Sequence, residues 1–190
     1  MTNRLHQAIL ISSAIVSSWL AMQAVHESGH VLAAWLGGGR VAKVVLNPLT
    51  ISRTDIAYNP HPLFVVWAGP IGGVIIPLLI GALAAGVRLP AAFLLRFFAG
   101  FCLIANGLYI GVGSFDSVGD CGDMLRNGSP IWHLWAFGLV TVPVGLLLWH
   151  RLGPHFGLGR QKKPINPGVA YASLVTCIVL LILGFVIDGN

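Results

Sequence analysis

The sequence predicts an all-α membrane protein, a polytopic bundle of about five transmembrane helices with a short β-hairpin after the first helix. Of the 190 residues, 56% are hydrophobic and only 9% are charged, and the mean hydropathy is +0.82. Soluble domains carry roughly 25% charged residues. Apolar runs of roughly 20 residues, enough to cross a bilayer, also recur along the chain. At this length we expect residues 1–190 to form a single integral-membrane domain.

The first expected span covers residues 5–36. It ends at the glycines of residues 37–39, because glycine adopts the left-handed conformation of a helix C-cap without steric cost. Its polar side chains fall close together on a helical wheel. Lipid would penalise each polar group by several kcal/mol, so this stripe should face the protein interior. The stripe consists of Ser12, Trp19, Gln23, His26, Glu27 and His30.

Residues 40–60 are the one stretch with strand character. Two β-prone segments, residues 41–46 and 49–58, flank an Asn47-Pro48 turn, which predicts a β-hairpin. The alternative is a plain connector between helices. A hairpin here would offer an exposed strand edge that can pair with an extended peptide.

Four further spans are expected after the hairpin. The first contains Ala68-Gly69-Pro70 and Gly73, and because glycines allow close helix approach, it should pack tightly against the first span. Asn106 is an amide in an apolar run and needs a hydrogen-bond partner, either as a bond between helices or in a catalytic role. The expected spans are 63–87, 91–112, 131–149 and 169–187, and the one long loop is 153–167.

The chemically informative motif lies in the last third of the first span. His26, Glu27 and His30 form an H-E-x-x-H motif. Positions four apart lie on one face of a helix, so both imidazoles can bind one Zn²⁺ ion, and Glu27 can reach a water on that ion. The alternative is that both histidines cap or satisfy polar groups near a helix end. Glu27 is the only glutamate in a chain poor in charge, and its place between two of seven histidines favours the metal site.

A third protein ligand is expected, since catalytic zinc usually takes three ligands from protein. Three of the five aspartates fall within residues 116–123, and with no other glutamate in the chain one of them is the natural ligand. Asp120 follows a glycine at an expected helix start, where the backbone can turn it inward. Asp123, one turn later, is the alternative ligand or the partner of a histidine. The purely structural alternative is that Asp120 caps a helix and Asp123 lies in its first turn.

Taken together, these features resemble the site-2 protease family of intramembrane zinc metalloproteases. The matching features are the H-E-x-x-H helix, the glycines that end it, the β segment, Ala68-Gly69-Pro70, and Asp120 after a third span. They cover about residues 20–125, inside a motif-bearing core of about 5–125. The resemblance implies cleavage of membrane-embedded or membrane-proximal peptide bonds, with Glu27 as general base. The zinc ligands that it implies are His26, His30 and Asp120.

Two positions depart from the family pattern. The family commonly has asparagine three residues after the proline of Gly-Pro, where this chain has Gly73. Its third ligand commonly lies in an Asn-Pro…Asp-Gly arrangement, whereas Asn106 here has no following proline. Asp123 and Asp116 therefore stay open as the third ligand, and we expect a compact, divergent member of the family.

The leading hypothesis is a zinc endopeptidase that acts on a membrane-protein substrate within the lipid bilayer, as a multi-pass protein of the bacterial inner membrane. The alternative is a non-catalytic metal-binding membrane protein, such as a transporter or sensor, that uses the same ligands. A transporter would need polar groups leading across the bilayer, and apart from Asn106 and some serines the spans lack them. The sparse, scattered basic residues do not suggest nucleic-acid binding, and three cysteines do not suggest a disulfide framework.

Overall fold

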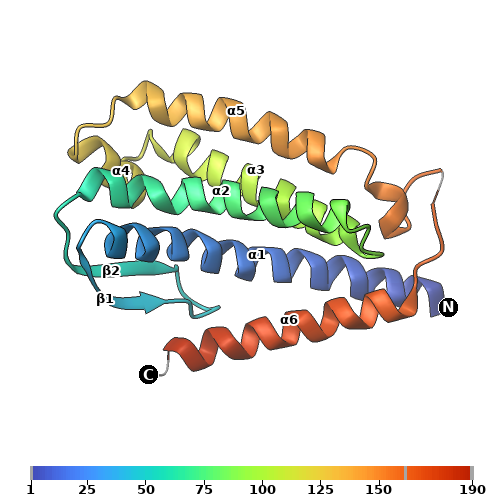
Figure 1. The fold of residues 1–190 in the computed structure, drawn as a ribbon. Helices are drawn as coiled ribbons and strands as arrows, with labels where there is room; N and C mark the ends of the chain where they lie inside the picture. The colour runs from blue at the N-terminus through green and yellow to red at the C-terminus, as the bar shows by residue number, and fades with distance from the viewer. Residues whose placement is uncertain (1, 161, 189–190) are drawn as a thin grey trace.

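The computed structural model describes residues 2–160 and 162–188. Five helices are long and apolar enough to cross a membrane, which confirms the predicted bundle (Figure 1). Each begins and ends within three residues of its expected bounds. They are α1 (Thr2–Leu36), α2 (Pro62–Gly86), α3 (Ala92–Gly113), α5 (Ile131–Trp149) and α6 (Pro167–Asp188).

Successive long helices run in opposite directions, so the bundle has two distinct ends (Figure 1). α2 packs against α1 and α3, α5 lies against α3, and α6 lies against α1 at the other side of the bundle. The N-terminus lies at one end. The last turns of α1 and α3 lie at the other end, together with the β-hairpin (Figure 1). The segments that follow α1 and α3 are therefore brought close together.

The predicted hairpin is present after the first helix. Strands β1 (Arg40–Val45) and β2 (Arg53–Tyr58) are antiparallel, with Val44 opposite Thr54. The expected start of the second strand at residue 49 is wrong. The Leu49 N–H donates to the Asn47 side-chain oxygen (2.9 Å) and the Thr50 N–H to the Asn47 carbonyl (3.1 Å), so these residues form turns instead of a ladder.

The glycines after α1 end the helix as expected. Gly38 has a φ of +74°, the left-handed conformation that glycine adopts freely. The N–H groups of Gly37 and Gly39 donate to the carbonyls of Ala33 and Ala34, at 2.9 and 2.7 Å, which satisfies two carbonyls of the last turn. The chain then turns directly into β1, which keeps the hairpin beside the last third of α1.

α1 and α2 approach closely, as the glycines of α2 predict. A Cβ on Gly29 of α1 would overlap the backbone of Ala68, and a Cβ on Gly69 of α2 would overlap the imidazole of His30. Glycine at both positions is what allows this contact. The close approach places the second histidine of the motif directly against α2.

The polar stripe of α1 is only partly buried. Gln23, His26, Glu27 and His30 are buried, in agreement with the prediction. For Ser12 and Trp19 the prediction is wrong, because both are exposed. The hydroxyl of Ser12 donates to the Ala8 carbonyl of its own helix (2.8 Å), so it needs no partner from the bundle interior.

Two short helices occupy the connections. α4 (Asp120–Arg126) lies between α3 and α5 and begins at the expected position. A 3₁₀ helix, η1 (Gly153–Phe156), lies in the expected long loop. The Gln7 side chain donates to the carbonyls of Phe156 and Gly157, at 2.9 Å each, and so ties this loop to α1.

Candidate active site

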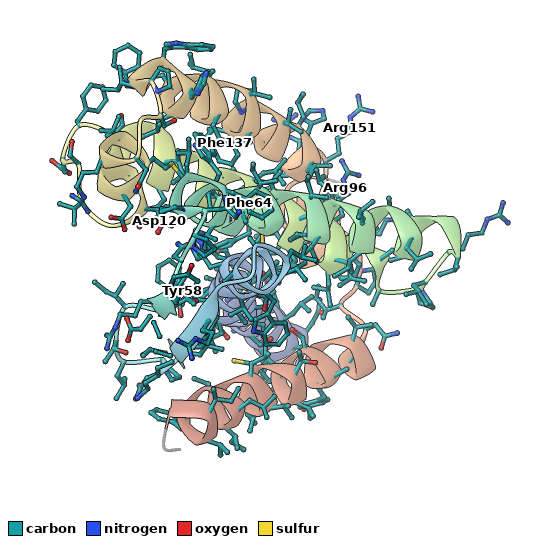
Figure 2. All side chains as sticks on the ribbon, turned by 60° about the vertical axis from the view of Figure 1, so that its left-hand side comes forward. Tyr58, Phe64, Arg96, Asp120, Phe137 and Arg151 are labelled. Carbon is teal, nitrogen blue, oxygen red and sulfur yellow. The ribbon has the colours of Figure 1, made fainter. Side chains whose placement is uncertain are left out.

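Three side-chain donor atoms converge near the end of α1. The Nε2 atoms of His26 and His30 are 3.1 Å apart, and Asp120 Oδ2 lies 2.8 Å from the first and 3.4 Å from the second. Both histidines are buried, and Asp120 is mostly covered. Figure 2 shows Asp120 on the side of α4 that faces α1 and the hairpin. The three side chains form a group that could hold a metal ion.

Asp123 lies outside this group. Its carboxylate accepts a hydrogen bond from Arg126 (2.6 Å), and its side chain is 52% exposed. Of the two aspartates considered for the third ligand, the structure therefore brings Asp120 to the histidines and leaves Asp123 at the surface. The remaining candidate, Asp116, is also absent from the group around the histidines.

The backbone around Gly119 turns Asp120 inward. Gly119 has φ +60° and ψ −139°, a conformation that favours glycine, and a Cβ there would lie 2.5 Å from the hydroxyl of Tyr109. That hydroxyl, on α3, accepts a hydrogen bond from the Asp120 N–H (3.1 Å). Asp120 is thus held through its own backbone by the helix that precedes it.

The hydrogen bonds of the two imidazoles decide which nitrogen of each ring carries the proton. His30 Nδ1 lies 2.8 Å from the carbonyl of Val65, which can only accept, so Nδ1 donates. His26 Nδ1 lies 2.7 Å from Asn106 Oδ1, an acceptor as well. In the neutral form of each ring, Nε2 therefore carries a lone pair.

Three lone-pair atoms thus face one another across at most 3.4 Å. Burial of the Asp120 carboxyl raises its pKa, but hydrogen bonds and charge from His26 and His30, when an Nε2 carries a proton, outweigh that effect and lower the pKa below its usual range. The carboxylate is therefore an anion. Such a group is stable only with a cation between its members, either a shared proton or a metal ion.

Glu27 lies beside this group, and 4% of it is exposed. Its Oε2 accepts a hydrogen bond from the hydroxyl of Thr54 on β2 (2.8 Å). The hairpin therefore reaches the carboxylate of the motif and holds one of its two oxygens.

All of these groups line a cleft of about 1060 Å³ that opens between α1, α3, α4 and the hairpin. Residues 48–52 of the hairpin loop and residues 53–56 of β2 form one wall. Within the described part of the chain β2 pairs with β1 alone, so one edge of β2 has no neighbouring strand. The cleft has the size of a site for a sizeable ligand or an extended peptide.

Sequence reasoning missed three partners of the site. The Val65 carbonyl that accepts from His30 is a backbone group, and because every residue has one, the sequence cannot single it out. Thr54 is a common residue in a strand and belongs to no motif. Asn106 carried a signal, an amide within an apolar run, but its contact with His26 depends on the packing of α3 against α1.

Residues 6–110, more than half of the sequence, match a protein family described as Peptidase M50B-like. The chain belongs to this family. The match confirms the predicted membership of the site-2 protease family. It includes His26, Glu27, His30 and Asn106 of the M50B-like protein, whereas Asp120 lies beyond it. No curated protein and no solved structure matches the chain.

Proposed function

We propose that this M50B-like protein is an intramembrane zinc endopeptidase that hydrolyses peptide bonds in membrane-embedded or membrane-proximal segments of proteins. The observation that carries the proposal is the convergence of His26, His30 and Asp120 in a cleft that Glu27 also lines. The family supports peptidase activity. The burial of the site among apolar helices supports a substrate within the membrane, and we propose the bacterial inner membrane as its location.

The donor set fits zinc. Zinc accepts neutral imidazole nitrogens and carboxylate oxygens at bonds of about 2.0–2.2 Å, so the ligand atoms of a tetrahedral site lie roughly 3.3–3.6 Å apart. The three donor atoms here are 2.8, 3.1 and 3.4 Å apart, so only small shifts are needed. Three protein ligands also leave one position open, as in catalytic sites.

When bound, zinc would supply a Lewis acid that lowers the pKa of a water and polarises the carbonyl of the bond to be cut. The chain's own residues do the rest. Glu27 accepts a proton from the attacking water and passes it to the leaving amine. The Thr54 hydroxyl holds Glu27 Oε2, which leaves Oε1 to exchange this proton. Asn106 and the Val65 carbonyl keep both Nε2 atoms free of protons.

The cleft supports an extended substrate. β2 forms one wall beside Glu27, and its open edge offers backbone groups to a peptide in strand conformation. Unwinding a helical segment would expose a peptide bond and let its backbone pair with β2. Substrate backbone groups then have hydrogen-bond partners, which lipid alone does not provide.

The proposal is tested on purified protein in detergent, with bound zinc and cleavage of a transmembrane reporter measured in the wild type and in Glu27→Gln. Glutamine fills the same space but cannot take the proton. We therefore expect similar zinc content in both proteins and cleavage by the wild type alone. Cleavage by Glu27→Gln at the wild-type rate would contradict the mechanism. Zinc binding without cleavage in both would favour a metal sensor or transporter.

A further inference from the structure

We propose that Asn106 is a positioning residue for the metal centre, which fixes the ring orientation and the proton position of His26. This inference rests on the proposed function. Asn106 is 1% exposed and lies in the second half of α3, where its neighbours along the chain are apolar. Its amide makes two hydrogen bonds, one to His26 and one to its own helix.

These two bonds leave the amide a single orientation. Asn106 Nδ2 donates to the carbonyl of Cys102, one turn earlier on α3, at 2.9 Å. If the amide turned over, its oxygen would face that carbonyl and two acceptors would meet. Oδ1 must therefore point to His26 Nδ1, 2.7 Å away, and must accept from it. The proton of His26 is kept on Nδ1, and Nε2 faces His30 and Asp120.

α2 leaves room for this amide. A Cβ built on Gly73 would lie 2.7 Å from Asn106 Nδ2 and 2.8 Å from Oδ1, closer than real side chains approach. Any larger residue at position 73 must displace the amide, because the side chain is the part of that contact that can move. The absence of a side chain on α2 is thus matched to the amide on α3.

The two histidines are held in different ways. His30 Nδ1 donates to the backbone carbonyl of Val65, which no substitution of that side chain removes. The corresponding bond of His26 depends wholly on the Asn106 side chain. Partners of metal-ligating histidines fix the ring and raise its basicity, and their loss commonly lowers metal affinity about 10–100-fold. We expect a loss of that size when Asn106 is replaced by an apolar residue.

Two other roles for Asn106 make different predictions. An amide that only joins α1 to α3 would affect the thermal stability of the protein but not the zinc affinity of the folded protein. An amide that binds substrate would change KM and leave zinc affinity unaltered. Zinc affinity, measured without substrate, therefore separates the positioning role from both.

The experiment is a zinc titration against a competing chelator, on full-length protein in detergent, with helix content checked by circular dichroism. Asn106→Leu should weaken zinc binding about 10–100-fold. Asn106→Asp should stay closer to the wild type than Asn106→Leu, because one oxygen of a protonated carboxyl can accept from His26 Nδ1 while the other donates to the Cys102 carbonyl. Gly73→Ala should also weaken binding, because its Cβ displaces the amide. The matched control is Gly81→Ala on the same helix, whose Cβ would meet its nearest atom at an ordinary 3.6 Å and should change nothing.

Unchanged zinc affinity in folded Asn106→Leu and in Gly73→Ala would overturn the positioning role. If Asn106→Leu does not fold, the zinc affinity of Gly73→Ala alone tests the positioning role. If the wild type binds zinc and cleaves the reporter, and neither Asn106→Leu nor Gly73→Ala lowers zinc affinity, only this inference is rejected and the proposed function stands. A wild type that binds no zinc would reject both.

Discussion

The Thr54 hydroxyl donates a hydrogen bond of 2.8 Å to the Glu27 carboxylate, and so connects the β-hairpin to the buried motif of α1. The hairpin therefore has two roles in the proposed enzyme. Its β2 strand lines the cleft where a peptide would lie, and one of its side chains orients the proposed base. A peptide that binds along β2 would therefore lie next to the residue that positions the Glu27 carboxylate.

Replacing Thr54 with valine should slow cleavage while zinc stays bound. Valine keeps the shape of threonine but cannot donate, and a hydrogen bond to a charged group is worth about 1.5–3 kcal/mol. We therefore expect kcat to fall roughly tenfold or more. The measurement is reporter cleavage together with zinc content. Thr176→Val serves as control, since its hydroxyl bonds only the Ala172 carbonyl of α6 and the residue is exposed. Equal kcat values in both variants would rule out this role.

Exchange of each aspartate of α4 for alanine should separate the two candidate ligands. Asp120→Ala removes the only carboxylate of the cluster and should abolish stoichiometric zinc binding. Asp123→Ala removes an exposed ion pair with Arg126, which is worth at most about 1 kcal/mol of stability. It should keep its zinc. The measurement is the zinc content of the two purified variants. If Asp123→Ala lost zinc and Asp120→Ala kept it, the third ligand would be Asp123, one turn later on α4.

A methyl group on Gly69 should disturb the metal centre from α2. Its Cβ would overlap the His30 ring, so Gly69→Ala should push that imidazole away and lower zinc affinity. Gly86→Ala is the control on the same helix, because nothing lies within 4 Å of the added Cβ. A chelator competition assay on both variants makes the comparison. Wild-type affinity in Gly69→Ala would mean that α1 and α2 are not held as closely as the structure places them.

Strand pairing between substrate and β2 can be tested on the substrate itself. In a strand, alternate N–H groups point to opposite sides, so only one set can bond β2. Reporter peptides N-methylated at alternate residues near the cleaved bond should therefore fall into two groups. One set should lose binding and the other should keep it, as judged by KM. An equal effect of both sets would argue against strand addition.

Much of the fold follows from sequence features with short-range causes. The apolar runs, the glycines after residue 36 and the Asn47-Pro48 turn act locally, and the structure has helices, a helix end and a hairpin at these places. The H-E-x-x-H spacing likewise puts His26 and His30 on one face of any helix. The start of β2 was missed because the Asn47 side chain extends the turn, which a strand pattern does not reveal.

The partners of the histidines and of Glu27 could not be predicted in the same way. Thr54, Val65 and Asn106 come from three different elements, and they reach the motif only through the packing of those elements around α1. The departure at Gly73 also becomes intelligible only in three dimensions. The space that a side chain would need at that position is occupied by Asn106 of the neighbouring helix.

The central claim is that His26, His30 and Asp120 together bind one zinc ion, and X-ray absorption at the zinc edge of the wild-type protein tests it most directly. We predict one zinc per chain, with imidazole nitrogen and carboxylate or water oxygen ligands at about 2.0–2.2 Å and no sulfur. Sulfur scattering at about 2.3 Å, which would require Cys102, Cys121 or Cys177, would contradict this account, and so would a protein that binds no zinc.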